Sequence, residues 1–163
     1  MSREIERKFL VKRELWHPAP RSGEYCLQGY LSTDPERVVR VRAFGDEAFL
    51  TVKGRQHGIT RAEFEYAIPR PDAEAMLTQL CLQPLVEKIR VHETFEGHVW
   101  DVDEFLGANR GLLVAEIELP SADAPFTLPP WVGEEVSNDP RYLNVNLARV
   151  PFTQWSHGPE PLV

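Results

Sequence analysis

The amino-acid sequence predicts a mainly β fold of the α+β kind, in which eight antiparallel strands close into a barrel with covering helices. Charged and apolar residues alternate at period two in repeated runs between Arg3 and Leu119, which is the periodicity of strands. Short connections join most of these runs, as is typical of antiparallel neighbours. The number of runs also favours closure, because about eight strands can form a small barrel.

The predicted strands follow this alternation in chain order. Turn-forming pairs such as Gly45-Asp46, His57-Gly58 and Glu96-Gly97 separate several of them, because these residues tolerate tight or left-handed backbone. The expected strands cover residues 3–11, 24–32, 37–44, 47–54, 59–68, 84–95, 97–105 and 111–120.

Two helices are predicted outside the alternation, and both are expected to cover the sheet. Apolar residues at i, i+3, i+4 and i+7 predict the first helix over 71–80. This stripe consists of Ala73, Met76, Leu77 and Leu80. The second helix is predicted over 140–149, with Asp139 as its N-cap and Pro140 in its first turn.

The chain length of 163 residues fits one compact domain. We expect this domain to cover residues 1–150. The segment 125–133 contains three prolines and is expected to be a connector. The tail 151–163 shows no periodicity and is expected to be loosely held.

The composition excludes several classes of protein. With 18 Lys and Arg against 25 Asp and Glu, the net charge is −7, which disfavours a surface that binds nucleic acid. No apolar run is long enough to cross a membrane, and the charged residues 1–8 do not resemble a signal peptide. We therefore expect a cytoplasmic protein without a membrane partner. The two cysteines and five histidines show no metal-ligand spacing.

One face of the predicted sheet collects the charged residues. Because side chains alternate across a strand, Glu4, Glu6 and Lys8 share one side of the first strand, and Ile5 and Arg7 face the other. The same alternation places seven bases and eight acids on one face of the whole sheet. The bases are Lys8, Arg40, Arg42, Lys53, Arg61, Lys88 and Arg90, and the acids are Glu4, Glu6, Glu63, Glu65, Asp101, Asp103, Glu116 and Glu118.

Two interpretations of this charged face stay open at this point. It can be the solvated side of an antiparallel sheet, laced with salt bridges. It can instead line a barrel, and then it must hold water, metal and a multiply charged ligand, because burying so many unpaired ions is costly. Arg and Lys match phosphate oxygens, and carboxylates without His or Cys favour Mg²⁺ or Mn²⁺.

The segment Glu4-Ile5-Glu6-Arg7-Lys8 resembles the E-x-E-x-K signature that opens members of the CYTH superfamily, the triphosphate tunnel metalloenzymes. Later segments resemble further blocks of the family in the same order, among them 39–42, 61–65, 86–90 and 116–118. The resemblance spans residues 3 to 149 and is strongest to the short bacterial inorganic triphosphatases. It implies an eight-stranded antiparallel barrel that is open at both ends and has its active site in the lumen.

The resemblance also implies a role for each charged residue. It assigns Glu4, Glu6 and Glu118 to a metal ion that bridges the triphosphate, and Asp103 and Glu116 to a second ion near the attacking water. It assigns phosphate oxygens to Lys8, Arg40, Arg42, Lys53, Lys88 and Arg90. As catalytic residues, Lys88 and Tyr30 would orient or deprotonate the water. Supporting contacts would come from Arg61, Glu63, Glu65 and Asp101, and Arg141 would close one mouth.

We therefore expect a hydrolase that depends on Mg²⁺ or Mn²⁺, with two ions in the turnover complex, and that splits inorganic tripolyphosphate into pyrophosphate and orthophosphate. Three alternatives stay open: a class IV adenylyl cyclase, a thiamine triphosphatase and a non-catalytic polyphosphate-binding module. The expected partner is a small-molecule triphosphate rather than a nucleic acid. Whether the chain forms a homodimer is left open.

Overall fold

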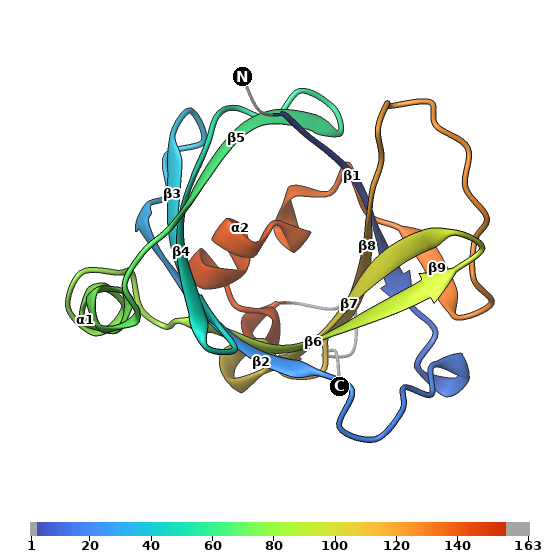
Figure 1. Cartoon of the computed structure of the whole chain (residues 1–163), viewed down its shortest axis with the longest axis horizontal. Coiled ribbons are helices and arrows are strands. Elements are labelled where there is room, and N and C mark those ends of the chain that lie inside the picture. The colour runs from blue at the N-terminus through green and yellow to red at the C-terminus, as the bar shows by residue number, and fades with distance from the viewer. Residues whose placement is uncertain (1–2, 156–163) are drawn as a thin grey trace.

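The strands of the protein close into a barrel around a central lumen (Figure 1). The computed structural model describes residues 3–155. Within that range nine strands form one antiparallel sheet in the order β5-β4-β3-β2-β6-β7-β8-β1-β9, and β5 also pairs with β1. The strands are β1 (Arg3–Val11), β2 (Glu24–Ser32), β3 (Val38–Phe44), β4 (Glu47–Lys53), β5 (Thr60–Ala67), β6 (Val86–Phe95), β7 (His98–Leu106), β8 (Leu113–Glu118) and β9 (Val132–Glu135).

Strands β1 to β8 confirm the eight predicted strands and the closed barrel, with ends that shift by at most two residues. Strand β9 was not predicted, so the expectation of a connector over 125–133 is wrong from Val132 onward. Its sequence Val-Gly-Glu-Glu is too short to show an alternation. It pairs with β1 at Phe9 and Val11, beyond the residues of β1 that pair with β5.

Helix α1 (Arg70–Gln79) covers part of the outer wall, as its apolar stripe predicts. Ala73 and Leu77 are buried against Val41, Ala43 and Ala48 of β3 and β4. Figure 1 shows this helix outside the ring of strands. The burial of Ala73 and Leu77 stabilises the helix against the wall, whereas Leu80, the last residue of the predicted stripe, follows the helix and is exposed.

The second predicted helix is broken into two parts. A 3₁₀ turn covers Pro140–Tyr142, and helix α2 covers Asn144–Arg149. Asp139 does cap the turn, since its side chain accepts a hydrogen bond from the Arg141 backbone N–H. Between the two parts Leu143 has extended backbone, with φ −65° and ψ 133°, so the expectation of one continuous helix over 140–149 is wrong.

Helix α2 lies across one end of the barrel rather than on its outer wall, and Figure 1 shows it through the ring of strands. Val145, Leu147 and Ala148 are buried in a core that includes Val86 and Phe105. Leu143, Asn144 and Val145 therefore line one end of the lumen. Both helices were expected to cover the sheet: α1 does so on the outer wall, whereas α2 covers one end of the barrel, so the two ends are not equally open.

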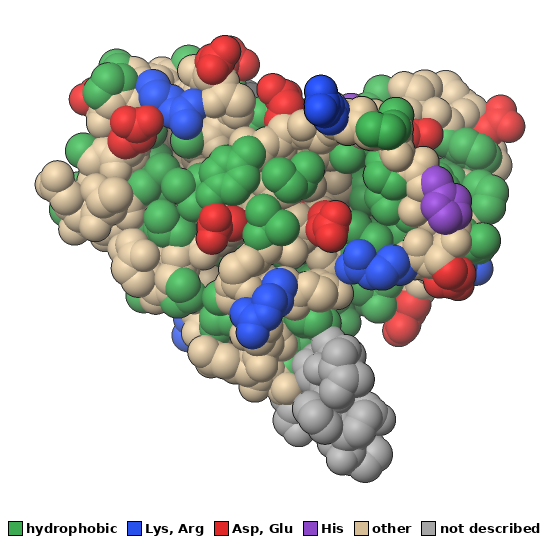
Figure 2. All heavy atoms as spheres, turned by 90° about the horizontal axis from the view of Figure 1, so that it is seen from below, with side chains coloured by type: hydrophobic (Ala, Val, Ile, Leu, Met, Phe, Trp, Pro, Cys, Tyr) green, Lys and Arg blue, Asp and Glu red, His purple; other side chains and the backbone are tan. Residues whose placement is uncertain are grey.

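The outer wall is largely apolar, as the alternation predicts. A second core packs Phe9, Trp100, Ile117 and Trp131 on the outside of β1, β7 and β8. Figure 2 shows one outer side of the barrel, where hydrophobic side chains spread between scattered charged groups. No helix within residues 3–155 is long and apolar enough to span a lipid bilayer.

The start of the predicted tail packs on the barrel. Phe152 is buried in the core around α2, and its backbone N–H donates to the Asn109 side-chain oxygen over 2.8 Å. Trp155 packs against the same core. The expectation of a loose tail is therefore wrong for residues 151–155, and the remainder, 156–163, lies outside the described residues.

Candidate active site

The lumen holds a cavity of about 220 Å³ whose wall is dominated by charged side chains. Its lining includes all but two of the residues that the sequence singled out, because the alternating strands turn their charged sides inward. These lining residues are Glu4, Glu6, Lys8, Tyr30, Arg40, Arg42, Lys53, Arg61, Glu63, Glu65, Lys88, Arg90, Asp101, Glu116 and Glu118. The charged face is thus the inside of a barrel, and the alternative of an open solvated sheet is excluded.

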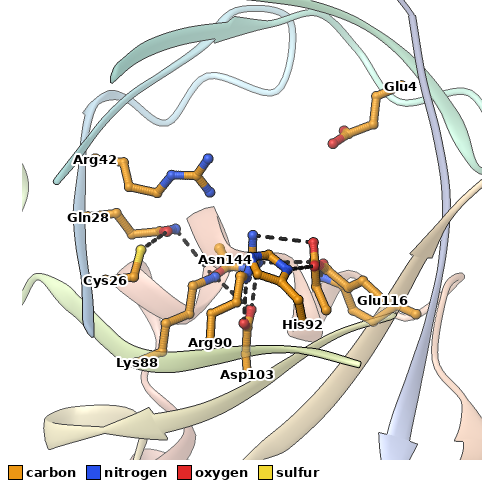
Figure 3. A network of polar contacts seen from close by, with 12 residues as sticks. Glu4, Cys26, Gln28, Arg42, Lys88, Arg90, His92, Asp103, Glu116 and Asn144 are labelled. Carbon is orange, nitrogen blue, oxygen red and sulfur yellow. Dashed lines mark hydrogen bonds and ion pairs between the residues drawn. The ribbon is translucent and has the colours of Figure 1, made fainter. Parts of the chain in front are cut away.

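Asp103 lies beneath the cavity surface, where two basic side chains hold it (Figure 3). Its Oδ1 accepts from Arg90 Nε over 2.7 Å, and its Oδ2 accepts from Arg90 Nη2 and Lys88 Nζ, each over 2.8 Å. Burial raises the pKa of Asp103, but Arg90 and Lys88 outweigh it and hold the pKa below its usual range. Both carboxylate oxygens are therefore engaged with cations.

Glu116 sits between Arg90 and one further base of the lumen, Lys8. Its Oε2 is 3.2 Å from Lys8 Nζ and its Oε1 is 3.3 Å from Arg90 Nη2. Burial raises the pKa of Glu116, but Lys8 and Arg90 outweigh it and lower the pKa to about 2. Asp103 and Glu116 together hold three lumen cations in fixed positions.

A second group of ion pairs lies along β4 and β5. Lys53 Nζ donates to Glu4 over 3.0 Å and is 3.7 Å from Glu63. Glu65 accepts from Thr51 Oγ1 over 2.8 Å and from Arg40 Nη2 over 3.3 Å. These contacts join strands β1, β3, β4 and β5 across the lumen, so these side chains are held by several strands at once.

Two lumen carboxylates, those of Glu6 and Glu118, have no basic partner in an ion pair within the described residues. Glu6 of β1 lies directly opposite Glu118 of β8 in the strand register, and no hydrogen bond or ion pair joins the Glu6 carboxylate to any described residue. Burial, then Glu116 and Glu4, raises the pKa of Glu6 to about 8. Burial, then Glu4 and Glu63, also raises the pKa of Glu118. Like charges directly opposite each other are destabilising, so this pair favours a bound cation.

Arg42 is the complementary case among the bases. Its buried Nε, like that of Arg40, has no hydrogen-bond partner within the described residues, but Arg40 also donates from Nη2 to Thr51 and Glu65. The one recorded ion pair of Arg42 is to Glu65, over 3.6 Å. Burial, then Arg40, lowers the pKa of Arg42. Figure 3 shows the guanidinium pointing into the lumen, where it presents several N–H donors to an anion.

The acids fit a divalent cation that shares its coordination with a ligand. Within residues 3–155 no three Asp, Glu, His or Cys side chains converge closely enough to enclose a metal by themselves. Mg²⁺ is usually bound by one or two carboxylates, with waters and substrate phosphates completing its shell. The uncompensated pair Glu6 and Glu118, with Glu4 nearby in the same cavity, matches that kind of donor set.

The predicted catalytic pair, Lys88 and Tyr30, lies near the α2 end of the lumen. Lys88 is 1% exposed, and burial lowers its pKa although Asp103 partly offsets the effect. The Tyr30 hydroxyl accepts from Gln28 Nε2 over 3.1 Å, and burial raises the Tyr30 pKa. Asn144 of α2 also contacts this group, so the pair belongs to a larger polar network.

Sequence reasoning missed Gln28 and Asn144 as members of the site. Gln28 is completely buried two residues before Tyr30 on the same face of β2, so the period-two rule could have found it. Asn144 carried no such signal, because its direction depends on the break in the helix at Leu143.

Arg141 lies away from the lumen cavity. Its side chain pairs with Asp139 over 2.7 Å and stacks on the Trp155 ring at 4.7 Å. It is largely exposed and belongs to a different groove, which also contains Arg149 and Gln154. This placement gives no support to its predicted position at the mouth of the tunnel.

Comparison with known proteins gives similarities along almost the whole chain. A family model described as CYTH domain matches residues 2–149. An inorganic triphosphatase of Acetivibrio thermocellus is 49% identical over 152 residues, which cover 93% of this chain and 97% of the relative. An inorganic triphosphatase of Nitrosomonas europaea is 38% identical, with 89% and 96% covered. The crystal structure of an inorganic triphosphatase matches with a TM-score of 0.64 at 38% identity, covering 91% of this chain and 95% of that one.

Proposed function

The chain belongs to the CYTH domain family, and we propose that it is a metal-dependent hydrolase of inorganic triphosphate. One observation carries the proposal: a single cavity contains uncompensated acids, Glu6 and Glu118, together with the incompletely paired base Arg42. A bound cation would compensate the charges of Glu6 and Glu118, and a polyanion would accept hydrogen bonds from Arg42. The triphosphatase relatives at 49% and 38% identity support the same ligand.

We assign the metal to Glu4, Glu6 and Glu118 and expect Mg²⁺ or Mn²⁺, which prefer oxygen ligands. When bound, such an ion neutralises phosphate charge and lowers the pKa of coordinated water. A second ion beside Asp103 and Glu116, which the family resemblance implies, requires Arg90 to release both carboxylates, because its guanidinium bonds to each of them. The first position likewise requires Lys53 to release Glu4, but Glu6 and Glu118 have no such ion-pair partner within residues 3–155.

The bases of the lumen hold the triphosphate in one orientation. Arg40, Arg42 and Lys53 lie on neighbouring strands β3 and β4. Arg90 on β6 and Lys8 on β1 flank them, each two strands away around the barrel. Their N–H groups match phosphate oxygens and are fixed before the substrate arrives by the carboxylates described above. Hydrolysis of a phosphoanhydride requires mainly this charge stabilisation and an aligned nucleophile.

Lys88 and Tyr30 are proposed to orient the attacking water. The Tyr30 oxygen already accepts from Gln28, so its own proton can be donated to the water. The new bond joins the water oxygen to a terminal phosphorus, and the adjacent anhydride bond breaks. The bridging oxygen leaves with the bonding electrons as part of pyrophosphate and takes up the proton that the water loses. The products are orthophosphate and pyrophosphate.

A phosphate-release panel tests the proposal. Tripolyphosphate, ATP, thiamine triphosphate and pyrophosphate are each incubated with Mg²⁺, with Mn²⁺ and with EDTA, and the products are separated by ion-exchange chromatography. We expect tripolyphosphate to give equal amounts of pyrophosphate and orthophosphate, with no turnover in EDTA. Cyclic AMP from ATP would establish a cyclase instead. Tight tripolyphosphate binding without any product in the presence of metal would establish a binding module.

A further inference from the structure

Asn144 is the first residue of helix α2, and it lies where this helix meets Lys88 and Gln28 at one end of the lumen (Figure 3). Its Oδ1 accepts two hydrogen bonds, from Lys88 Nζ over 3.0 Å and from Gln28 Nε2 over 3.2 Å. Lys88 and Gln28 are both almost completely buried, so their geometry is tightly constrained. Asn144 is the residue of α2 that contacts both of them within the described chain.

These two contacts fix the orientation of the Asn144 amide. An ammonium and an amide NH₂ are both donors, so the group facing them must be the carboxamide oxygen. If the amide were flipped, its NH₂ group would face the Lys88 ammonium and the Gln28 NH₂ group, and three donors would meet without an acceptor. The Oδ1 has two lone pairs and both are used, so Asn144 offers no further acceptor in this direction.

The Asn144 Nδ2 therefore presents its donors elsewhere. It has no recorded hydrogen-bond acceptor within residues 3–155, and Asn144 is half-buried and lines the lumen cavity. The break at Leu143 is what turns the side chain inward, and the backbone is anchored there because Lys8 Nζ donates to the Tyr142 carbonyl over 3.0 Å. Because Asn144 lines that cavity, its two neutral N–H donors are available to an anion bound beside Lys8 and Lys88.

We propose that Asn144 is a substrate-binding residue at the α2 end of the lumen, whose Nδ2 donates to a phosphate oxygen while its Oδ1 holds Lys88 and Gln28 in place. The inference rests on the proposed function, because it names a contact to the same triphosphate. It makes α2 part of the site rather than a packing element only.

Two substitutions separate this role from a structural one. Asn144→Ala removes both the donor and the acceptor. Asn144→Asp keeps an acceptor for Lys88 and Gln28 but replaces the donors with a negative oxygen facing the phosphate. We expect Kd for tripolyphosphate to weaken by about tenfold in Asn144→Ala and by about 100-fold in Asn144→Asp, since hydrogen bonds to charged groups have effects of this size. If Asn144 only positioned Lys88, Asn144→Ala would lower kcat and leave Kd for tripolyphosphate at the wild-type value.

The Kd is measured by isothermal titration calorimetry in EDTA, so that a metal bound by the new carboxylate cannot contribute, and KM is measured with Mg²⁺. The matched controls are Asn146→Ala and Asn146→Asp, because Asn146 lies in the same helix and bonds to the Pro140 carbonyl instead of the lumen. Both controls should keep wild-type Kd and KM. Thermal unfolding in EDTA checks that every variant is folded.

Weaker binding in the order wild type, Ala, Asp, with unchanged Asn146 controls, supports the inference. An Asn144→Asp variant that binds tripolyphosphate as well as wild type, or better than Asn144→Ala, would overturn it while wild-type turnover leaves the proposed function standing. A wild-type chain that neither binds nor hydrolyses tripolyphosphate would overturn both.

Discussion

Two neighbouring residues of β1 hold charge in opposite settings. Arg7 faces outward and is fully paired: its Nε and Nη2 donate to the two oxygens of Glu135 over 2.9 and 2.6 Å, and its guanidinium lies 4.9 Å from the Phe126 ring centroid. Glu6 faces inward and lies opposite another acid, Glu118. Adjacent residues of one strand therefore differ: Arg7 belongs to an ion pair, whereas Glu6 lies opposite a like charge.

The difference shows which charges of the barrel are structural and which are available to a ligand. On the outer wall, hydrogen bonding to Arg7 is the main reason that the pKa of Glu135 is lowered. In the lumen, burial and neighbouring acids raise the pKa of Glu6 to about 8. A group whose charged form is disfavoured by the surrounding protein gains most from a nearby cation. Glu6 is thus available to a ligand, whereas Glu135 is already engaged by Arg7.

The largest expected effect on turnover comes from replacing Glu6, one of the two lumen acids without an ion-pair partner in the described residues. We expect Glu6→Gln to lower the rate of tripolyphosphate hydrolysis by about 100-fold or more, because loss of a metal contact removes several kcal/mol of charge stabilisation. The far-ultraviolet circular dichroism spectrum should not change, since no hydrogen bond or ion pair holds the Glu6 carboxylate within residues 3–155. Steady-state phosphate release with saturating Mg²⁺ measures the effect. A variant with wild-type kcat would contradict the metal assignment.

The next largest effect, on substrate binding, comes from replacing Arg42. We expect Arg42→Ala to weaken tripolyphosphate binding by about 30-fold, as removal of a charge-assisted contact to phosphate does. Its thermal stability should stay the same or rise, because the buried Nε lacks a partner in the described structure. Calorimetric titration and thermal unfolding in EDTA measure both quantities. Strong destabilisation with unchanged binding would show that Arg42 belongs with the structural charges.

The pH dependence of stability gives a third and smaller contrast. In the folded protein the pKa of Glu6 is raised to about 8 from the ordinary glutamate value of 4.5. Its contribution to stability is therefore fully present below about pH 4.5 and is lost as the pH rises through 8. We expect wild type in EDTA to lose on the order of 2 kcal/mol of unfolding free energy relative to Glu6→Gln between pH 5 and pH 9.

Urea titrations of both chains at several pH values measure this difference, and added Mg²⁺ should remove most of it by binding the folded state. Parallel pH curves for the two chains would show that Glu6 is not the group responsible. A Mg²⁺ effect of equal size in both chains would place the cation elsewhere.

The inward direction of Glu6 and the outward direction of Arg7 could be predicted from the sequence, because the side-chain period of a strand is two and closure puts one whole face inside. The same rule placed nearly every lumen charge correctly. It could not tell which acids are paired. Asp103 and Glu116 are on the same face as Glu6, and only the register of β6, β7 and β8 shows that Arg90 lies beside both of them.

The break at Leu143 could not be predicted for a different reason. The signals around Pro140 favour a helix start, and nothing in the local sequence opposes its continuation to Arg149. The chain extends at Leu143 where the segment meets the end of the lumen, with the Tyr142 carbonyl bonded to Lys8 and the Asn144 amide bonded to Lys88. These contacts join residues 56 and 134 positions apart, so no local pattern contains them.

The smallest expected effect is on stability and comes from replacing Arg7, the outward-facing residue of the comparison. Arg7→Ala removes a bidentate ion pair that is about one-third exposed and a contact with Phe126, so we expect a loss of only about 1 kcal/mol of unfolding free energy. Because the pKa of Glu135 is lowered in the fold, the wild-type advantage should be present above about pH 4.5 and disappear as the pH falls through the lowered value. Urea titrations at pH 7 and pH 3 measure this change. Hydrolysis of tripolyphosphate should stay at the wild-type rate, because the guanidinium is on the outer wall. A loss of turnover comparable to that of Glu6→Gln would mean that the two faces of β1 are coupled, and the separation between structural and ligand-binding charges would not hold.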